Sequence, residues 1–108
     1  MEEAIELAVL VYENFKGCRD FGFRGQIQEG AVSVPNNIAE GYERSSNAEF
    51  IRFLDIARGS YGEVRSQTYV AIRVRLLSEE KGNGQISHSK RLSKGIARLM
   101  TVRRKDFS

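Results

Sequence analysis

Apolar residues recur at intervals of three and four along most of the chain, and no stretch alternates between apolar and polar positions. Such spacing is typical of amphipathic α-helices. The pattern predicts four helices, over residues 2–16, 24–44, 47–78 and 85–104. Short connections between four helices predict an all-α, antiparallel, up-down-up-down four-helix bundle. The length of 108 residues, without an internal repeat, indicates one domain over residues 1–108.

The first two predicted helices differ in how clearly their pattern selects one buried face. In the first, a stripe is widened by further apolar residues, so more than one face is expected to be buried: Ile5, Ala8, Val9, Tyr12 and Phe15, with Leu7, Leu10 and Val11. The second predicted helix also has an apolar stripe, and Pro35 lies within it. Either a helix begins there with Ser33 as its cap, or one long helix is kinked.

The third predicted helix carries two apolar stripes. One faces the bundle: Phe50, Phe53, Leu54, Ala57, Tyr61, Val64, Thr68, Ala71 and Ile72. The other, made of Ile56, Val70 and Leu77 and broken by Glu63, lies well round the helix. One small core cannot use both faces, so the second stripe predicts a subunit interface. Gly59 and Gly62 each cost about 1 kcal/mol relative to alanine in a helix, which favours close approach of a neighbouring helix.

The third predicted helix has a signal at each end. Ser46 or Asn47 is expected to cap this helix at its start, and a polar, glycine-containing segment follows its end. Residues 81–84, Lys-Gly-Asn-Gly, are the clearest turn signal in the chain. A fourth helix with an apolar stripe at Leu92, Ile96, Leu99 and Met100 is expected to follow.

The net charge of +3 conceals a strong asymmetry between the two halves of the chain. Residues 1–54 hold five basic and nine acidic side chains, a net −4, whereas residues 55–108 hold twelve and five, a net +7. The fourth helix concentrates the excess. Cations at helical spacing can follow a phosphate backbone, and these residues are the candidate contacts: Lys90, Arg91, Lys94, Arg98, Arg103, Arg104 and Lys105.

The same cations also fit a solvated helix face that complements the negative end of the helix dipole, and Arg103, Arg104 and Lys105 fit that alternative well. Assembly into an oligomer would repeat the basic face and strengthen its field. No aromatic residues interleave with the cations, so stacking on bases and sequence-specific recognition are not expected.

The composition excludes most catalytic chemistry. One cysteine, Cys18, excludes an intramolecular disulfide and a multi-cysteine metal site, and one histidine, His88, excludes a multi-histidine metal centre. No Gly-rich phosphate loop and no Glu-x-x-His pair is present. We therefore expect no enzyme activity, no cofactor, no metal and no small-molecule substrate. No apolar run approaches the roughly 20 residues of a membrane span, and the Met-Glu-Glu start lacks a signal's positive region, which predicts a cytoplasmic protein without a membrane partner.

Two stretches carry a family resemblance: residues 31–44, AVSVPNNIAEGYER, and residues 49–60, EFIRFLDIARGS, followed by Glu63. They resemble the small four-helix bundle proteins encoded within intervening sequences of bacterial 23S ribosomal RNA genes. The resemblance implies a homopentameric ring or barrel and a kink, rather than a helix start, at Pro35. It implies that Asn37 and Glu40 are buried polar groups bonded to neighbouring helices. The residues of this structural motif are Pro35, Asn37, Glu40, Gly41, Gly59 and Glu63.

The same fold is used by the accessory variability determinant of diversity-generating retroelements, a basic pentamer that associates with a reverse transcriptase and nucleic acid. Members of the family often carry a basic pair before the Ala-Val-Ser motif, where this chain has Gln28, Glu29 and Gly30. That departure moves the expected nucleic-acid contacts to the fourth helix and to Arg73 and Arg75.

The sequence therefore supports two functional hypotheses. The leading one is a non-enzymatic, pentameric protein that binds RNA or DNA by electrostatics, with a reverse transcriptase as a further partner. The other is a structural scaffold whose ring binds a protein partner and has no direct role with nucleic acid.

Overall fold

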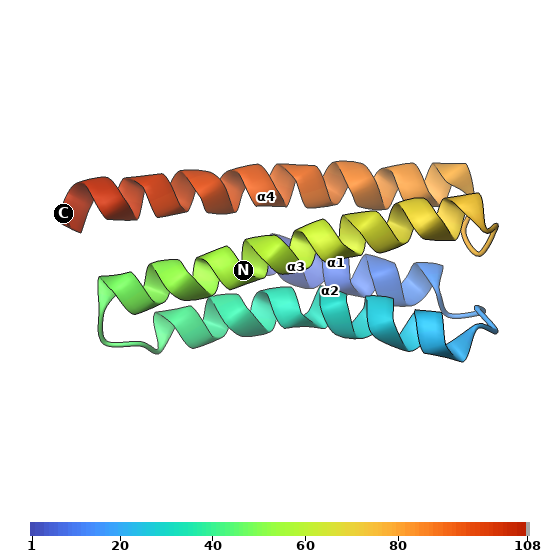
Figure 1. The fold of residues 1–108 in the computed structure, drawn as a ribbon, viewed down its shortest axis with the longest axis horizontal. Coiled ribbons are helices and arrows are strands. Elements are labelled where there is room, and N and C mark those ends of the chain that lie inside the picture. Colours follow the sequence, from blue (N-terminus) through green and yellow to red (C-terminus); the bar gives the residue numbers. More distant parts are fainter. Residues whose placement is uncertain (108) are drawn as a thin grey trace.

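The computed structural model describes residues 1–107, with the side chains of residues 1–105. Four helices follow in order, α1 (Glu2–Asn14), α2 (Phe21–Tyr42), α3 (Asn47–Arg73) and α4 (Glu79–Phe107). Helix α1 packs between α2 and α4, and α3 lies diagonally across from it. The bundle is elongated, 47 × 20 × 19 Å, with α1 visibly the shortest rod (Figure 1). The predicted all-α four-helix bundle is confirmed.

The apolar stripe chosen for α1 is partly wrong. The side chains that enter the core are Ala4, Leu7, Ala8, Val11 and, just beyond the helix, Phe15. Ile5, Val9 and Tyr12 are exposed on the opposite side. Both sides of α1 are apolar, so periodicity alone could not select the one that faces α2 and α4. The subunit consequently carries an exposed apolar stripe along α1.

Helix α2 begins three residues earlier than predicted because Asp20 caps it. The Asp20 carboxylate accepts a hydrogen bond from the backbone N–H of Phe23 at 3.0 Å. Pro35 lies inside the continuous helix, so the alternative of a fresh helix start at this residue is wrong. The Asn37 amide donates to the carbonyl of Ser33, in its own helix, at 2.7 Å.

The expectation that Asn37 and Glu40 are buried and bond to neighbouring helices is wrong for the subunit. Glu40 is exposed and pairs with Arg44, one turn along α2. Gly41 does have the role of a close packing position, because a Cβ there would lie 3.2 Å from Phe50 Cδ1 and from Phe53 Cβ.

Helix α3 starts as predicted, with the Ser46 hydroxyl accepting from the N–H of Glu49 at 3.1 Å. It ends at Arg73, five residues before the predicted end. The N–H of Leu76 bonds to the Ala71 carbonyl at 2.9 Å and that of Arg75 to the Ile72 carbonyl at 3.1 Å. These two bonds form a Schellman motif, which places Arg75 in the left-handed region at φ 65°.

The early end of α3 overturns the place of Leu77 in the predicted subunit interface. Leu77 lies in the α3–α4 connection, is 7% exposed and belongs to the core. The seven-residue spacing between Val70 and Leu77 predicts an outward stripe only if both residues are helical, and α3 ends before Leu77. Ile56 and Val70 do lie on the outer side of α3, 39% and 47% exposed.

The turn predicted at residues 81–84 is wrong, because this segment forms the first turns of α4. The Ser78 hydroxyl caps the helix by accepting from the N–H of Lys81 at 3.2 Å. Gly82 is buried, and a Cβ there would overlap the side chain of Ile72. Gly82 therefore serves close packing of α4 on α3.

Gly59 and Gly62 are not explained by packing within the subunit. Nothing lies within 4 Å of a Cβ built at Gly59, and at Gly62 only the Arg65 guanidinium approaches, at 3.9 Å. The close helix approach predicted for these positions is therefore absent between the described elements of one subunit.

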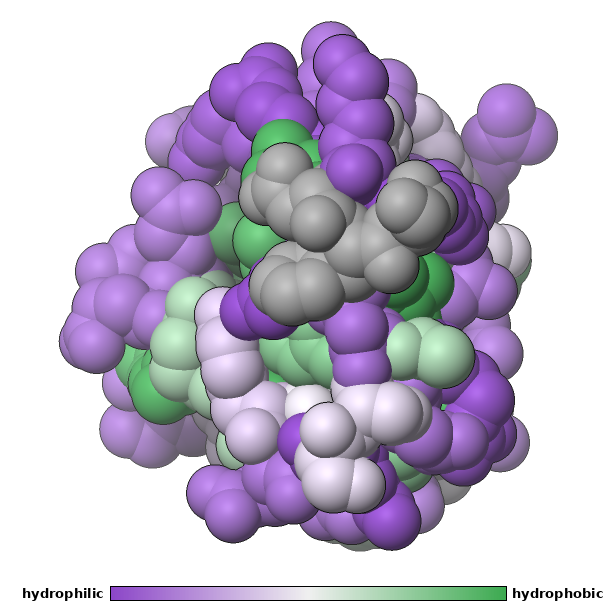
Figure 2. All heavy atoms as spheres, turned by 90° about the vertical axis from the view of Figure 1, so that its left-hand side faces the viewer, coloured by the Kyte–Doolittle hydropathy of each residue, from purple (hydrophilic) through white to green (hydrophobic). Residues whose placement is uncertain are grey.

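One end of the bundle leaves an apolar groove, because α1 is shorter than its neighbours. Figure 2 shows this end, where several hydrophobic residues are visible among mostly hydrophilic ones. Ile38, Leu54 and Ile96 line a cavity of about 270 Å³ there. The buried Tyr61 hydroxyl makes no hydrogen bond to the described residues, and burial raises the pKa of this phenol.

Arg75 gives a stability prediction. Left-handed backbone disfavours a residue with a Cβ, so Arg75→Gly is expected to raise the free energy of unfolding by about 1 kcal/mol. Urea denaturation of both proteins measures this difference. Arg75→Ala keeps the Cβ and is expected to show no such gain; an equal gain in that variant would assign the effect to the arginine charge instead.

Candidate nucleic-acid interface

Most of the cations predicted on the fourth helix lie on the side of α4 that is turned away from the bundle. All of the following are exposed and form the basic face of α4: Lys90, Arg91, Lys94, Arg98, Arg104 and Lys105. Within residues 1–105, ion pairs occur at Arg44, Arg52 and Arg58. No carboxylate among these side chains neutralises the basic face, so its charge is available to a polyanion.

Arg103 differs from its neighbours. Its guanidinium lies over the Phe50 ring, 4.5 Å from the centroid, and its carbonyl accepts from the Asn47 amide at 3.1 Å. A cation over an aromatic face is held by the ring quadrupole. Arg103 thus joins α4 to the start of α3 and is turned away from the basic face.

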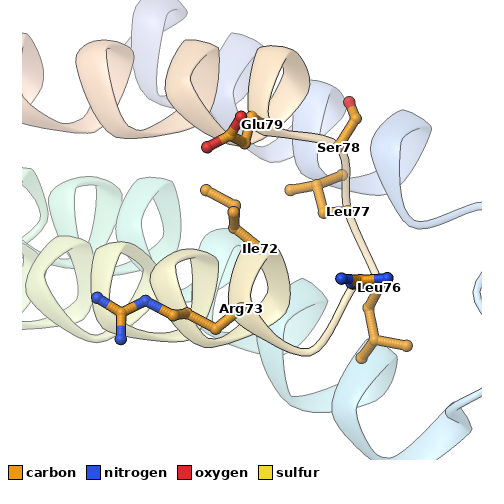
Figure 3. Close-up of a pocket in the computed structure, with 7 residues that line it drawn as sticks. Ile72, Arg73, Leu76, Leu77, Ser78 and Glu79 are labelled. Carbon is orange, nitrogen blue, oxygen red and sulfur yellow. The ribbon is translucent and has the colours of Figure 1, made fainter.

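Arg73 and Arg75 lie at the α3–α4 connection. Both are exposed and line a shallow depression with Ile72, Leu76, Leu77, Ser78 and Glu79. Figure 3 shows the Arg73 side chain directed along α3, away from Ser78. The two cations therefore sit at the end of the bundle where α3 is joined to α4.

Sequence reasoning missed Arg65. The guanidinium Nη1 donates to the Ser89 hydroxyl at 3.2 Å and to the Ser93 hydroxyl at 3.0 Å, which joins α3 to α4. A signal was present in the sequence. Arg65 stands four residues after Tyr61, and Ser89 and Ser93 follow the four-residue spacing of an inward face, so polar residues occupy positions where apolar ones were expected.

His88 lies on the side of α4 that faces α1. Its Nδ1 is buried without a hydrogen-bond partner in residues 1–105. Burial lowers the pKa of His88, and the charge of Arg91 lowers it further, while Glu6 and Glu3 on α1 act in the opposite direction. The neutral imidazole is therefore favoured in the folded state.

This shift predicts how stability responds to acid. The unfolded chain, with an ordinary histidine pKa near 6.5, binds more protons than the folded chain below that pH. We expect the free energy of unfolding to fall as pH decreases through 6.5 toward the folded-state pKa. Denaturant titrations of wild type and His88→Gln at several pH values measure the contribution; a parallel pH dependence in both proteins would contradict it.

Two features are absent from the part of the chain that the structure describes. No group of three or more His, Cys, Asp or Glu side chains there could hold a metal ion. None of the described helices combines the length and hydropathy needed to cross a membrane.

Fold and surface define a small all-α bundle with one strongly basic outer face. The chain belongs to the family described as 23S rRNA-intervening sequence protein, whose profile matches residues 1–98. A solved structure, a protein of unknown function from the S23 ribosomal protein family of Bacteroides thetaiotaomicron VPI-5482, is similar with a TM-score of 0.87 at 23% identity. The match covers 92% of this chain and 95% of that one, and supports the fold alone. No curated protein matches the chain.

Proposed function

We propose that this protein is a non-enzymatic homopentamer that binds structured RNA through the basic face of α4. The observation that supports binding most directly is the set of exposed cations on α4 without ion-pair partners among the described side chains. Helical spacing spreads these cations over several turns, which suits contacts with successive phosphates rather than with bases. Family membership agrees with this proposal but does not assign an activity.

Exposed apolar residues support assembly. Ile5, Val9 and Tyr12 on α1, and Ile56 and Val70 on α3, lie outside the core of the subunit. Gly59, between Ile56 and Val70 on α3, leaves room for a neighbouring subunit. Apolar patches of this kind mark protein interfaces. A ring formed through α3 would bury Ile56 and Val70, leave the α1 residues exposed and present the basic face once in each subunit.

Binding measured at two salt concentrations tests the electrostatic mechanism. If four cations contact phosphates, the affinity for an RNA hairpin should fall roughly a hundredfold between about 50 and 200 mM salt. Fluorescence anisotropy with a labelled hairpin gives both values. Absence of binding at the lower salt, or binding that does not respond to salt, would contradict the proposal.

A reverse transcriptase is the proposed protein partner, with the apolar stripe of α1 as a surface that a protein could cover. The alternative function, a scaffold without a nucleic-acid role, uses the same stripe. Nuclease treatment distinguishes the accessory function from the scaffold function. The accessory function predicts a complex with a reverse transcriptase and RNA together, whereas the scaffold predicts a protein complex that is indifferent to nuclease and to the basic face.

A further inference from the structure

Arg65 has an environment that its packing does not explain. It is partly buried between α3 and α4, and no carboxylate within residues 1–105 pairs with it. Partial burial of a cation without a counterion is costly. The nearest acid along α3, Glu63, precedes Arg65 by two residues and so points to a different side of the helix. The site is therefore electropositive, with no carboxylate among the described side chains paired to it.

The two serines hold the guanidinium in one orientation. Both bonds come from Nη1, with Ser89 fully buried beneath it and Ser93 partly buried beside it. Among the described side chains, Nε and Nη2 make no hydrogen bond. The Nε–Nη2 edge carries parallel N–H groups, and this fork matches two oxygens of a phosphate or carboxylate.

The neighbours of Arg65 leave this edge accessible and keep it positive. Gly62, one turn earlier, has no side chain, and a Cβ there would lie 3.9 Å from Nη2. Lys90 precedes Ser93 by three residues, so it lies on the same flank of α4. Tyr69, 49% exposed, follows Arg65 by one turn on α3. Gly62 therefore places no side chain over this edge of the guanidinium.

We propose that Arg65, positioned by Ser89 and Ser93, is a phosphate-binding site between α3 and α4. A phosphate accepts two hydrogen bonds from Nε and Nη2, and Lys90 adds charge from α4. The assignment to a nucleic-acid phosphodiester rests on the proposed function; recognition of the phosphate group itself does not. The bound polymer then follows the α3–α4 flank as well as the basic face of α4.

The test compares wild type with Arg65→Met, which keeps the apolar stem and removes the charge. Lys16→Met, in the α1–α2 connection, is the matched control because it removes one exposed charge outside α3 and α4. With an RNA hairpin at about 100 mM salt, Arg65→Met should bind about tenfold more weakly and lose about one unit of salt slope. Lys16→Met should match wild type.

The second probe is inorganic phosphate at fixed ionic strength, which should raise the Tm of wild type but not of Arg65→Met.

The two probes distinguish the possible failures. If Arg65→Met binds RNA more weakly but its Tm still rises with phosphate, the site binds the polymer backbone. If Arg65→Met binds RNA as wild type does but its Tm no longer rises with phosphate, the site binds a free phosphate. If wild type binds no RNA, the proposed function fails, and the phosphate shift alone decides the site. Unchanged behaviour of Arg65→Met with both probes overturns the inference. If Arg65→Met does not fold, Arg65→Lys, which keeps the charge but not the fork, should still reduce both responses.

Discussion

Reversing two charges on the basic face, Lys94→Glu with Arg98→Glu, is expected to weaken RNA-hairpin binding by on the order of a hundredfold or more at low salt. Each removed contact is a charge-assisted hydrogen bond worth about 1.5–3 kcal/mol, and the new carboxylates repel phosphate. Both side chains are exposed on α4, so the fold should be unaffected. Anisotropy across a salt series, with circular dichroism for helicity, measures both effects.

A matched control tests whether a change in total charge alone explains the weaker RNA binding. Lys16→Glu with Arg19→Glu changes the net charge by the same amount at exposed positions near the α1–α2 connection. We expect this variant to bind nearly as wild type. Equal weakening in both double variants would show that total charge, rather than the basic face of α4, determines affinity.

Val70→Glu is expected to convert the assembly to a monomer of about 12 kDa with unchanged helicity. Val70 is 47% exposed in the subunit, so a glutamate there is solvated in the monomer but becomes an unpaired buried charge at a subunit contact. Light scattering of the eluting protein gives the mass. A wild type that elutes as a monomer would refute the pentamer, and a pentameric Val70→Glu would remove this side of α3 from the interface.

Leu77→Asp provides the contrast, because sequence spacing placed Leu77 on the same stripe. Leu77 is 7% exposed and packs in the core, so we expect a loss of about 3–5 kcal/mol in unfolding free energy. Urea denaturation separates this folding defect from the assembly defect expected of Val70→Glu.

Much of the candidate interface could be predicted from sequence. Local spacing on one helix determines which side chains share a face, so Lys90, Lys94 and Arg98 were placed together before any fold was known. All three are exposed on α4 in the structure. Arg103 was grouped with them, but its contact with Phe50 depends on how α4 crosses the start of α3.

Arg65 shows why the rest of the candidate site could not be predicted from the sequence. Its two serine partners lie 24 and 28 residues away, and no local rule brings them to Nη1. The end of α3 was missed for a related reason. Arginine is not the usual residue for a left-handed helix end, whereas the glycines at 82 and 84 imitate a turn signal.

The sequence by itself determined the helical class, the number of helices, most of the core stripe of α3 and the charged side of α4, because each depends on periodicity within one segment. Only the tertiary structure decided which side of α1 is buried, where α3 ends, that Leu77 is in the core, and that Arg65 meets two serines. Those features depend on contacts between segments, in which packing selects among faces and turns that are locally equivalent.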